Sequence, residues 1–300
     1  MRNFGEMVDE TLSYLRSYVR DQEQSTHLAQ AVTFDQVDID VAEGGLITRG
    51  RIQIDDELMW VDKADRSTGR VSIPPYGRGM DGTTKADHAA GARVIVQPLF
   101  PRKVVKDRLN DAIRQVGSRL YGIEELTFVG DPTTFAYPLP QYTREVLDVQ
   151  VSDERGPKFT WDTRRERRWT FDRRAPLSIT VSGKALYLRE YALSSVERLT
   201  VVIGRDPAAL LFDTQMFDET FLPASAWDVP VLFAAARMLA TGDAYNIQTR
   251  AVEANTLDSK VQAGSAVSYS KYLLGLATAR LEEERGRLLT ETAQHVHYSR

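Results

Sequence analysis

The sequence contains no cysteine. This absence excludes disulfide bonds, thiolate catalysis and metal sites built from cysteine ligands. A strong excess of charge of either sign is also missing, because 38 basic residues stand against 42 acidic ones and the net charge is −4. This near balance argues against a nucleic-acid binder driven by overall charge, although it leaves room for a local basic patch.

Long apolar runs are missing as well. No stretch approaches the roughly 18 apolar residues that a bilayer span requires. The first residues, Met1 to Glu6, include an acidic side chain and no apolar segment, so we expect no signal peptide and no membrane partner. With 300 residues, 42% of them hydrophobic, the chain is long enough for one to three domains and at least one substantial core.

Apolar residues recur at three- and four-residue spacing in four separate segments, which predicts four helices. The third segment is apolar on most sides and is expected to be buried. In the fourth, Gly264, Gly275 and Gly286 each weaken a helix by about 1 kcal/mol relative to Ala, so we expect a bend or a close helix contact at one of them. The expected helices are residues 4–22, 101–121, with Gly122 as the cap, 229–247 and 259–292.

Two other regions alternate with a period of two around turn residues, which predicts β-strands. Residues 34–97 predict a small all-β unit of four to six strands, a barrel or a sandwich. In the second region, Ser182-Gly183-Lys184 is expected to be the turn of a hairpin that pairs residues 179–181 with residues 186–188. The second set of expected strands is 134–137, 146–151, 169–171, 177–181, 185–188 and 199–203.

These elements predict an α+β fold: a discontinuous bundle of about four helices with two inserted β modules, a small barrel or sandwich and a β platform. Amphipathic helices that are separated by β modules must find one another to bury their apolar stripes. The predicted division is residues 1–33, 99–125 and 222–300 for the bundle, 34–98 for the small β domain and 126–221 for the platform.

The sharpest local motif is a turn motif followed by a strand, made of Arg78, Gly79, Gly82, Thr83, His88 and Gly91. A phosphate-cradle interpretation fails because the signature Gly-Lys-Ser/Thr and its strand–helix context are missing. We expect a structural β-connection in which two glycines bracket a tight turn, residues 83–87 begin a helical turn and His88 bonds to the backbone.

No residue pattern predicts catalysis. The sequence has neither a Gly-x-Ser-x-Gly elbow nor a defensible acid–base pair of carboxylates. His295 and His297 are too few to form a competent metal site, which needs three or four ligands. We therefore expect a non-enzymatic protein with no catalytic residues, no cofactor and no metal.

The densest charge in the chain is an arginine cluster interleaved with aromatic residues. Arginine forks suit phosphates, carboxylates and protein interfaces alike. Three interpretations stay open: a solvated hairpin with internal ion pairs, a contact to a partner subunit, or a contact to DNA. The arginine cluster comprises Arg164, Arg165, Arg167, Arg168, Arg173 and Arg174, together with Trp169.

Residues 56–61, 76–84 and 88–94 together resemble a module of tailed-bacteriophage structural proteins, which reads roughly Gly-Asp-Glu-x-apolar, then Arg-Gly-x-x-Gly-Thr, then His-x-x-Gly-x-x-Val. Asp55 stands where that module often has glycine. The match covers about a fifth of the chain. It occurs in several kinds of virion protein, so it indicates a phage origin more strongly than a role.

The elements around this module are helices that flank two β modules, and the last helix is long. This arrangement is similar to that of head-to-tail connector (adaptor) proteins of tailed phages. This resemblance implies a viral structural protein of the neck, assembled in the host cytoplasm, whose identical subunits form a ring, typically of twelve. The implied partners are the portal protein, tail or stopper and terminator proteins, and double-stranded DNA that passes without specific binding. Two alternatives stay open: another tail or baseplate attachment protein, or a virion-associated hydrolase.

Overall fold

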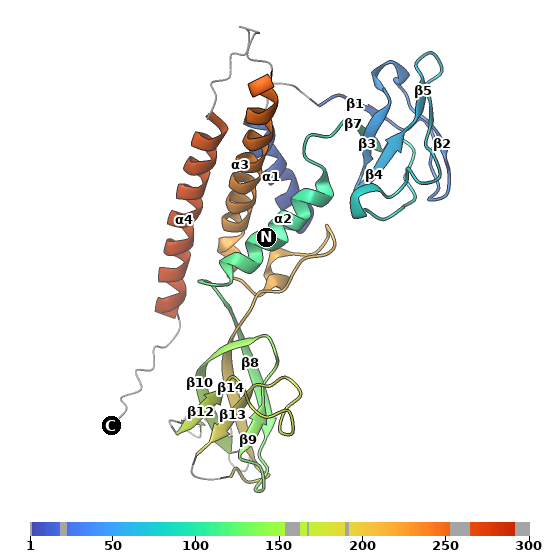
Figure 1. Ribbon diagram of the computed structural model, residues 1–300. Coiled ribbons are helices and arrows are strands. Elements are labelled where there is room, and N and C mark those ends of the chain that lie inside the picture. The colour runs from blue at the N-terminus through green and yellow to red at the C-terminus, as the bar shows by residue number, and fades with distance from the viewer. Residues whose placement is uncertain are drawn as a thin grey trace. The chain divides into compact units, whose positions relative to one another are not determined.

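The computed structural model describes residues 2–18, 23–153, 163–166, 168–189, 192–252 and 265–291 (Figure 1). The fold is α+β, as predicted: four α-helices alternate along the chain with two antiparallel β modules. The helices are α1 (Phe4–Tyr18), α2 (Arg102–Val116), α3 (Asp228–Val252) and α4 (Ser265–Glu291).

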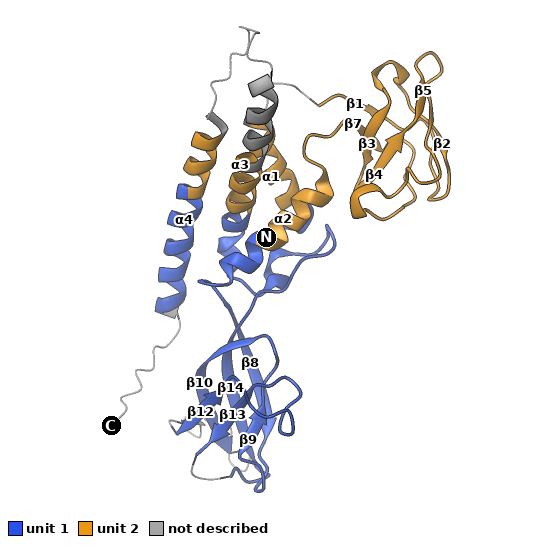
Figure 2. Ribbon diagram, in the orientation of Figure 1, with its two compact units in different colours: residues 1–5, 112–230, 275–300 blue, residues 6–111, 231–274 orange. Residues whose placement is uncertain are grey.

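The chain divides into two compact units, and both are built from segments far apart in sequence (Figure 2). Unit 1 comprises residues 1–5, 112–230 and 275–300, and unit 2 comprises residues 6–111 and 231–274. Each unit contains one of the β modules and parts of several helices. The predicted three-part division into a bundle, a small β domain and a platform stays a prediction.

The helices occupy the segments that the periodicity predicts, and α3 is buried over Val231–Leu239 apart from one exposed side chain. The second helix ends at Val116, five residues earlier than expected. After Val116 the chain continues in turns, in which Ser118 N–H donates to the Gln115 carbonyl and Arg119 N–H to the Val116 carbonyl. The guanidinium of Arg144 donates hydrogen bonds to the carbonyls of Gly117 and Ser118, just beyond the helix. Gly122 is the first residue of a strand and does not cap the helix, which corrects the prediction.

The first β module, in unit 2, consists of two antiparallel sheets with strand orders β1-β7-β3-β4 and β2-β6-β5. Apolar residues of both sheets, among them Ile39, Ile52, Met59 and Val94, form one core. The sheets do not close into a barrel, so the sandwich was the better of the two expected forms. The strands are β1 (Ser25–His27), β2 (Asp38–Asp40), β3 (Gly50–Ile54), β4 (Glu57–Val61), β5 (Lys63–Asp65), β6 (Arg70–Ser72) and β7 (Arg93–Val96).

The second β module, in unit 1, also has two antiparallel sheets, with strand orders β11-β10-β14-β8 and β12-β13-β9. Side chains from both sheets, including Tyr137, Val149, Leu186 and Val201, share a core. The strands are β8 (Gly122–Val129), β9 (Ala136–Pro138), β10 (Thr143–Asp153), β11 (Thr163–Arg165), β12 (Trp169–Asp172), β13 (Ala185–Leu188) and β14 (Glu197–Arg205).

The predicted hairpin around Gly183 does not form. Residues 177–181 form turns, in which the N–H groups of Ile179 and Thr180 donate to the carbonyl of Pro176. Strand β13 pairs instead with β12 and β9. Local hydrogen bonding by Thr180 and Ser182 competes with strand pairing here, which a period-two pattern alone cannot reveal.

Among the described residues, no helix combines the length and the apolar character that crossing a membrane would require.

Candidate functional site

The turn motif of the first β module surrounds a carboxylate at the start of a strand. Asp55 and Asp56 form the turn between β3 and β4, and Asp55 has a positive φ of 51°, which Asp adopts more readily than most residues. Glu57 is the first residue of β4, and its side chain is 0% exposed. The tight turn therefore delivers a carboxylate into the interior of the module.

The segment after Arg78 approaches the same carboxylate through a tight loop. Gly79 and Gly82 bracket this loop with φ of 66° and 78°, in the region that favours glycine. The Thr83 hydroxyl accepts a hydrogen bond from Leu58 N–H at 3.1 Å and donates one to the Met80 carbonyl at 2.8 Å. The expected helical turn at residues 83–87 is absent; a short 3-10 turn lies before it instead, at Met80–Gly82.

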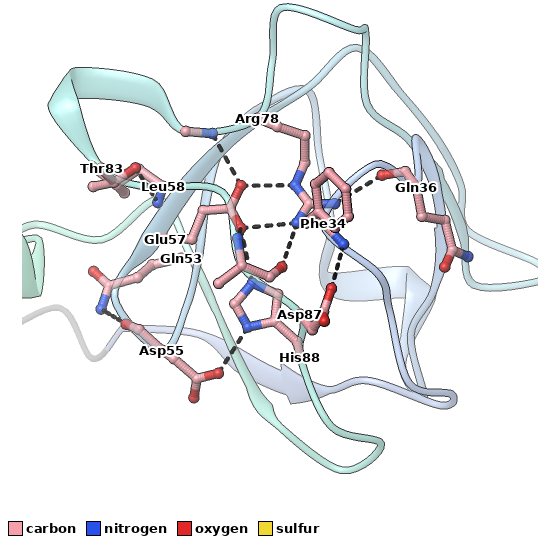
Figure 3. A network of polar contacts seen from close by, with 12 residues as sticks. Phe34, Gln36, Gln53, Asp55, Glu57, Leu58, Arg78, Thr83, Asp87 and His88 are labelled. Carbon is pink, nitrogen blue, oxygen red and sulfur yellow. Dashed lines mark hydrogen bonds and ion pairs between the residues drawn. The ribbon is translucent and has the colours of Figure 1, made fainter.

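Arg78 and Glu57 form a buried bidentate ion pair, drawn in Figure 3. The Nε–Oε1 and Nη2–Oε2 distances are 2.7 and 2.9 Å, and the Arg78 side chain is 1% exposed. The other Arg78 N–H groups donate to the carbonyls of Thr33, Gln36 and Ala86 at 2.8–2.9 Å. All five guanidinium donors are thus satisfied, which is the condition for burying an arginine at low cost.

His88 completes the network by approaching the same carboxylate oxygen of Glu57 that Arg78 Nη2 contacts (Figure 3). Its Nε2 lies 3.0 Å from Glu57 Oε2 and its Nδ1 lies 2.8 Å from Asp55 Oδ2. The expectation that the ring bonds to the backbone is therefore wrong. The main chain of His88 does pair with that of Val32, at 2.7 and 2.9 Å, but both ring nitrogens face carboxylates.

The surroundings shift the pKa values of both groups. Burial alone would raise the pKa of Glu57, but the hydrogen bonds from Arg78, His88 and the Ala86 N–H outweigh it and lower that pKa to about 2. Burial alone would lower the pKa of His88, but the carboxylates of Glu57 and Asp55 outweigh it and raise that pKa above its ordinary value. The raised pKa of His88 favours the form in which its protonated ring and Arg78 face the two carboxylates.

The network joins four stretches of chain and leaves little capacity for a ligand. Glu57 accepts from Arg78, His88, Gly79 N–H and Ala86 N–H, so both of its oxygens are engaged. The Asp87 carboxylate adds a further link between the loops, because it accepts a hydrogen bond from Phe34 N–H at 2.7 Å. We interpret this arrangement as a cross-link that holds the long loops of the module in place, in keeping with the structural role predicted for the motif.

The arginine cluster is split between the two sheets of the second β module. Arg164 and Arg165 lie on β11, where they contact Glu197 at 3.1 Å and Asp148 at 3.3 Å. Arg173, just after β12, lies 5.7 Å from the ring of Phe171, and Arg174 beside it is exposed. Exposed Arg168 and half-buried Trp169 lie at the start of β12, and Arg167 lies outside the described residues.

These contacts favour neither DNA nor a protein partner, and the three interpretations of the cluster stay open. The predicted internal ion pairs do exist for Arg164 and Arg165, yet both side chains are more than half exposed. Exposed pairs of this kind contribute little to stability.

Sequence reasoning missed the role of Glu57 and Asp55 in this network. One signal was present: an acidic residue begins an otherwise apolar strand segment, Glu57-Leu58-Met59-Trp60-Val61. An acidic side chain in such a place needs a buried partner. In the described part of the chain, no group of three or more His, Asp or Glu residues is arranged to hold a metal ion.

Comparison of the sequence with protein-family models and with curated proteins gives no significant match, so the site rests on its own geometry.

Proposed function

We propose that this chain is a structural subunit of a tailed-phage particle, and that identical copies form a ring which joins the portal to the tail and lets DNA pass. The sequence resemblance described above supports the proposal. So does the alternation of four helices with two β modules. The observation that carries it in the structure is the surface of α4.

Helix α4 buries only one narrow stripe along its length. Large apolar side chains remain on its exposed surface, among them Tyr272, which is 65% exposed, and Leu274, Leu276 and Leu289, which are 43%, 39% and 39% exposed. We take these exposed apolar residues, which flank the buried stripe on both sides, as part of a contact surface for neighbouring copies. The buried stripe is Ser270, Leu273, Ala277, Leu281, Glu284 and Leu288.

The glycines of α4 fit the same interpretation. Among the described residues, a Cβ atom built on Gly275 or on Gly286 would have nothing within 4 Å, so neither glycine makes there the close helix contact that we expected as an alternative to a bend. Gly264 lies outside the described residues. A glycine inside an exposed helix costs about 1 kcal/mol relative to Ala. A neighbouring copy that packs closely against α4 at these positions would explain why glycine is present there, because a larger residue would keep the two apart.

Polar contacts anchor the buried side of α4 in unit 1. Arg280 donates to Asp228 at 2.8 Å and to Glu284 at 3.1 Å, and its contacts with Asp228 and Glu283 raise its pKa. Ser225 adds a bond to Glu284 at 2.6 Å. In unit 2, the Ser270 hydroxyl donates to the Ala236 carbonyl at 2.6 Å. These bonds hold the buried stripe of the helix, while the apolar side chains Tyr272, Leu276 and Leu289 remain exposed.

The charge of the chain is compatible with DNA passage. A strongly basic channel would retain DNA by releasing its counterions, whereas this chain carries a net charge of −4. The buried ionic network of the first β module also supports a structural role, because its own loops use the donors of Arg78 and the oxygens of Glu57.

The test is the mass and the image of the purified chain, alone and mixed with portal protein. We expect a closed annulus, twelve-fold in negative stain, at least when portal is present. A monomer that ignores portal would contradict the proposal. A ring that forms but does not bind portal would favour another position in the tail or baseplate.

A further inference from the structure

The four-stranded sheet of the second β module ends in a long and regular edge strand, β8. Its register against β14 runs without a shift from Gly122 opposite Arg205 to Val129 opposite Arg198. Natural proteins usually protect such an edge with proline, lysine, a bulge or a very short strand. The sequence of β8 contains neither proline nor lysine. An eight-residue edge of this kind is a template for another strand.

The pairing register shows which backbone groups face outward. Opposite residues in antiparallel strands alternate between hydrogen-bonded and non-hydrogen-bonded pairs. Gly130 N–H donates to the Glu197 carbonyl at 2.8 Å, one step beyond the pair of Val129 and Arg198. The even-numbered residues of β8 are therefore the ones bonded to β14. The N–H and carbonyl groups of Ile123, Glu125, Thr127 and Val129 point away from it.

The side chains of the same four residues are exposed, and two of them are apolar. Ile123 is 43% exposed and Val129 is 55% exposed. The neighbouring Glu124 is instead bound to Arg205 at 2.7 Å, so Glu125 carries the available charge of this edge. The outer edge of β8 thus combines backbone N–H and carbonyl groups that point away from β14, exposed apolar side chains and one negative charge.

The other edge of the sheet, among the described strands, is β11, and it carries the opposite charge. Arg165 lies opposite Gln150 of β10, whereas Val149 and Val151 on either side of Gln150 are buried in the core. Arg165 is thus on the outer face of the sheet. Leu126 packs on the core, and successive side chains of a strand point to opposite faces. Its neighbour Glu125 therefore lies on the outer face too.

Strand direction allows these two edges to join. All three pairings in the sheet are antiparallel, so β8 runs opposite to β11 across four strands. A second copy in the same orientation, displaced around a ring, would therefore bring its β11 alongside β8 in the antiparallel sense. A head-to-tail contact between two different surfaces is also the contact that generates a ring.

We propose that β8 of one copy pairs with β11 of the next copy, which makes one continuous antiparallel sheet around the ring, with Glu125 facing Arg165 of the neighbour. This inference rests on the proposed ring and adds its lateral contact. Diagonal and direct cross-strand pairs of opposite charge lie within reach of each other in such a sheet.

The first experiment blocks the edge without changing its charge. Thr127→Pro removes an N–H that points away from β14, so the bonds within the subunit remain. We expect a folded subunit, with amide exchange of β14 unchanged, whose assembly in sedimentation or native mass measurements is at least about tenfold weaker, corresponding to about 1.4 kcal/mol. Thr127→Ala keeps the N–H and is expected to assemble like the wild type.

The second experiment exchanges the charges of Glu125 and Arg165. It tests the pairing of β8 with β11 even if the proline variant fails to fold. Glu125→Arg and Arg165→Glu are each expected to weaken assembly, because like charges would then face each other. The double variant restores the attraction and is expected to assemble within about threefold of the wild type, a difference of less than 1 kcal/mol. Arg165→Glu also loses the ion pair with Asp148, which is an exposed contact of small value.

The outcomes separate the lateral contact from the ring itself. Rings that form normally with folded Thr127→Pro, or single charge variants without effect, would overturn the continuous sheet and leave the ring standing. A defect of Glu125→Arg that Arg165→Glu does not repair would indicate that β8 contacts another part of the neighbouring copy, and would overturn its pairing with β11. A wild-type chain that stays monomeric with and without portal would overturn both proposals.

Discussion

The buried network of Asp55, Glu57, Arg78 and His88 shows how a few residues hold a loop-rich module together. The side chains of Glu57, Arg78 and His88 are at most 1% exposed, and each of their charges faces an opposite charge. A buried ion pair contributes little net stability compared with an apolar pair, but removing one partner leaves an uncompensated buried charge. The module therefore depends on the three buried members of the network, Glu57, Arg78 and His88.

Glu57→Gln is expected to destabilise the first β module by about 3–5 kcal/mol, because it leaves Arg78 and His88 buried without their shared anion. Amide exchange of β3 and β4 measures the loss locally. Asp55→Asn is the matched control: its side chain is 64% exposed, and asparagine tolerates its positive φ, so we expect a loss of less than about 1 kcal/mol. Equal effects of the two substitutions would contradict this account.

The network also predicts a bell-shaped dependence of the module's stability on pH. The pKa of Glu57 is lowered from 4.5 to about 2, so its contribution is complete above pH 4.5 and is lost as the pH falls through about 2. The pKa of His88 is raised from 6.5, so its contribution is complete below pH 6.5 and is lost as the pH rises through the raised value. Denaturant unfolding across this range measures both limbs.

His88→Gln serves as the control for the alkaline limb. In the wild type, loss of the proton places a ring lone pair against a carboxylate oxygen, since both ring nitrogens face carboxylates. The variant has no proton to lose there, so its stability should not fall above pH 6.5. A wild-type module whose stability is constant from pH 5 to 9 would refute the charged state of His88.

At the scale of the element, α4 combines a narrow buried stripe with two glycines, Gly275 and Gly286, at which an added Cβ atom would meet no atom of the described residues. Gly275→Ala and Gly286→Ala are each expected to stabilise the isolated subunit by up to about 1 kcal/mol, because the added methyl group meets no atom and restricts the unfolded chain. Thermal unfolding of the monomer, or amide exchange of α4, measures the change.

Ala279→Gly, at an exposed position of the same helix, is the reverse control and is expected to lose a similar amount. If Gly275→Ala instead destabilises the monomer, the glycine has a role within the subunit that its open surroundings do not suggest. Stabilised monomers that assemble poorly would place a neighbouring copy against α4.

Strand β13 shows how one element was predicted correctly while its partner was not. Residues 185–188 form a strand as expected. Leu177 and Val181, in the segment assigned as its partner, are 77% and 97% exposed, so that segment gains nothing from pairing in a sheet. Alternation indicates that a segment is compatible with a strand, but burial against a second layer decides whether a strand forms.

At the scale of the whole molecule, the two compact units are discontinuous in sequence. Each β module brings its own core, formed between two sheets. Such a module is inserted without disturbing the helices that precede and follow it, because its strands satisfy one another's backbone groups. The proposed ring uses this arrangement: the helices and the β modules offer separate surfaces to neighbours.

The α+β class, four helical segments and the alternation with two β modules were determined by the sequence, because amphipathic periodicity reflects burial along the chain itself. Short strands such as β1 and β5, with three residues each, carry too few positions to show a period. They exist because neighbouring strands supply hydrogen-bond partners from distant parts of the chain, as Arg93–Ile95 does for β1.

Only the tertiary structure decided which side chains from distant parts of the chain contact one another. The sequence places Glu57 and Arg78 21 residues apart and His88 31 residues from Glu57, and no local rule pairs them. The same holds for Arg144, which bonds the carbonyls of Gly117 and Ser118 just after α2. Local pattern determines which elements can form, because it acts over a few residues. Contacts between distant charges depend on the folded chain, because burial strengthens their attraction and makes an unpaired charge costly.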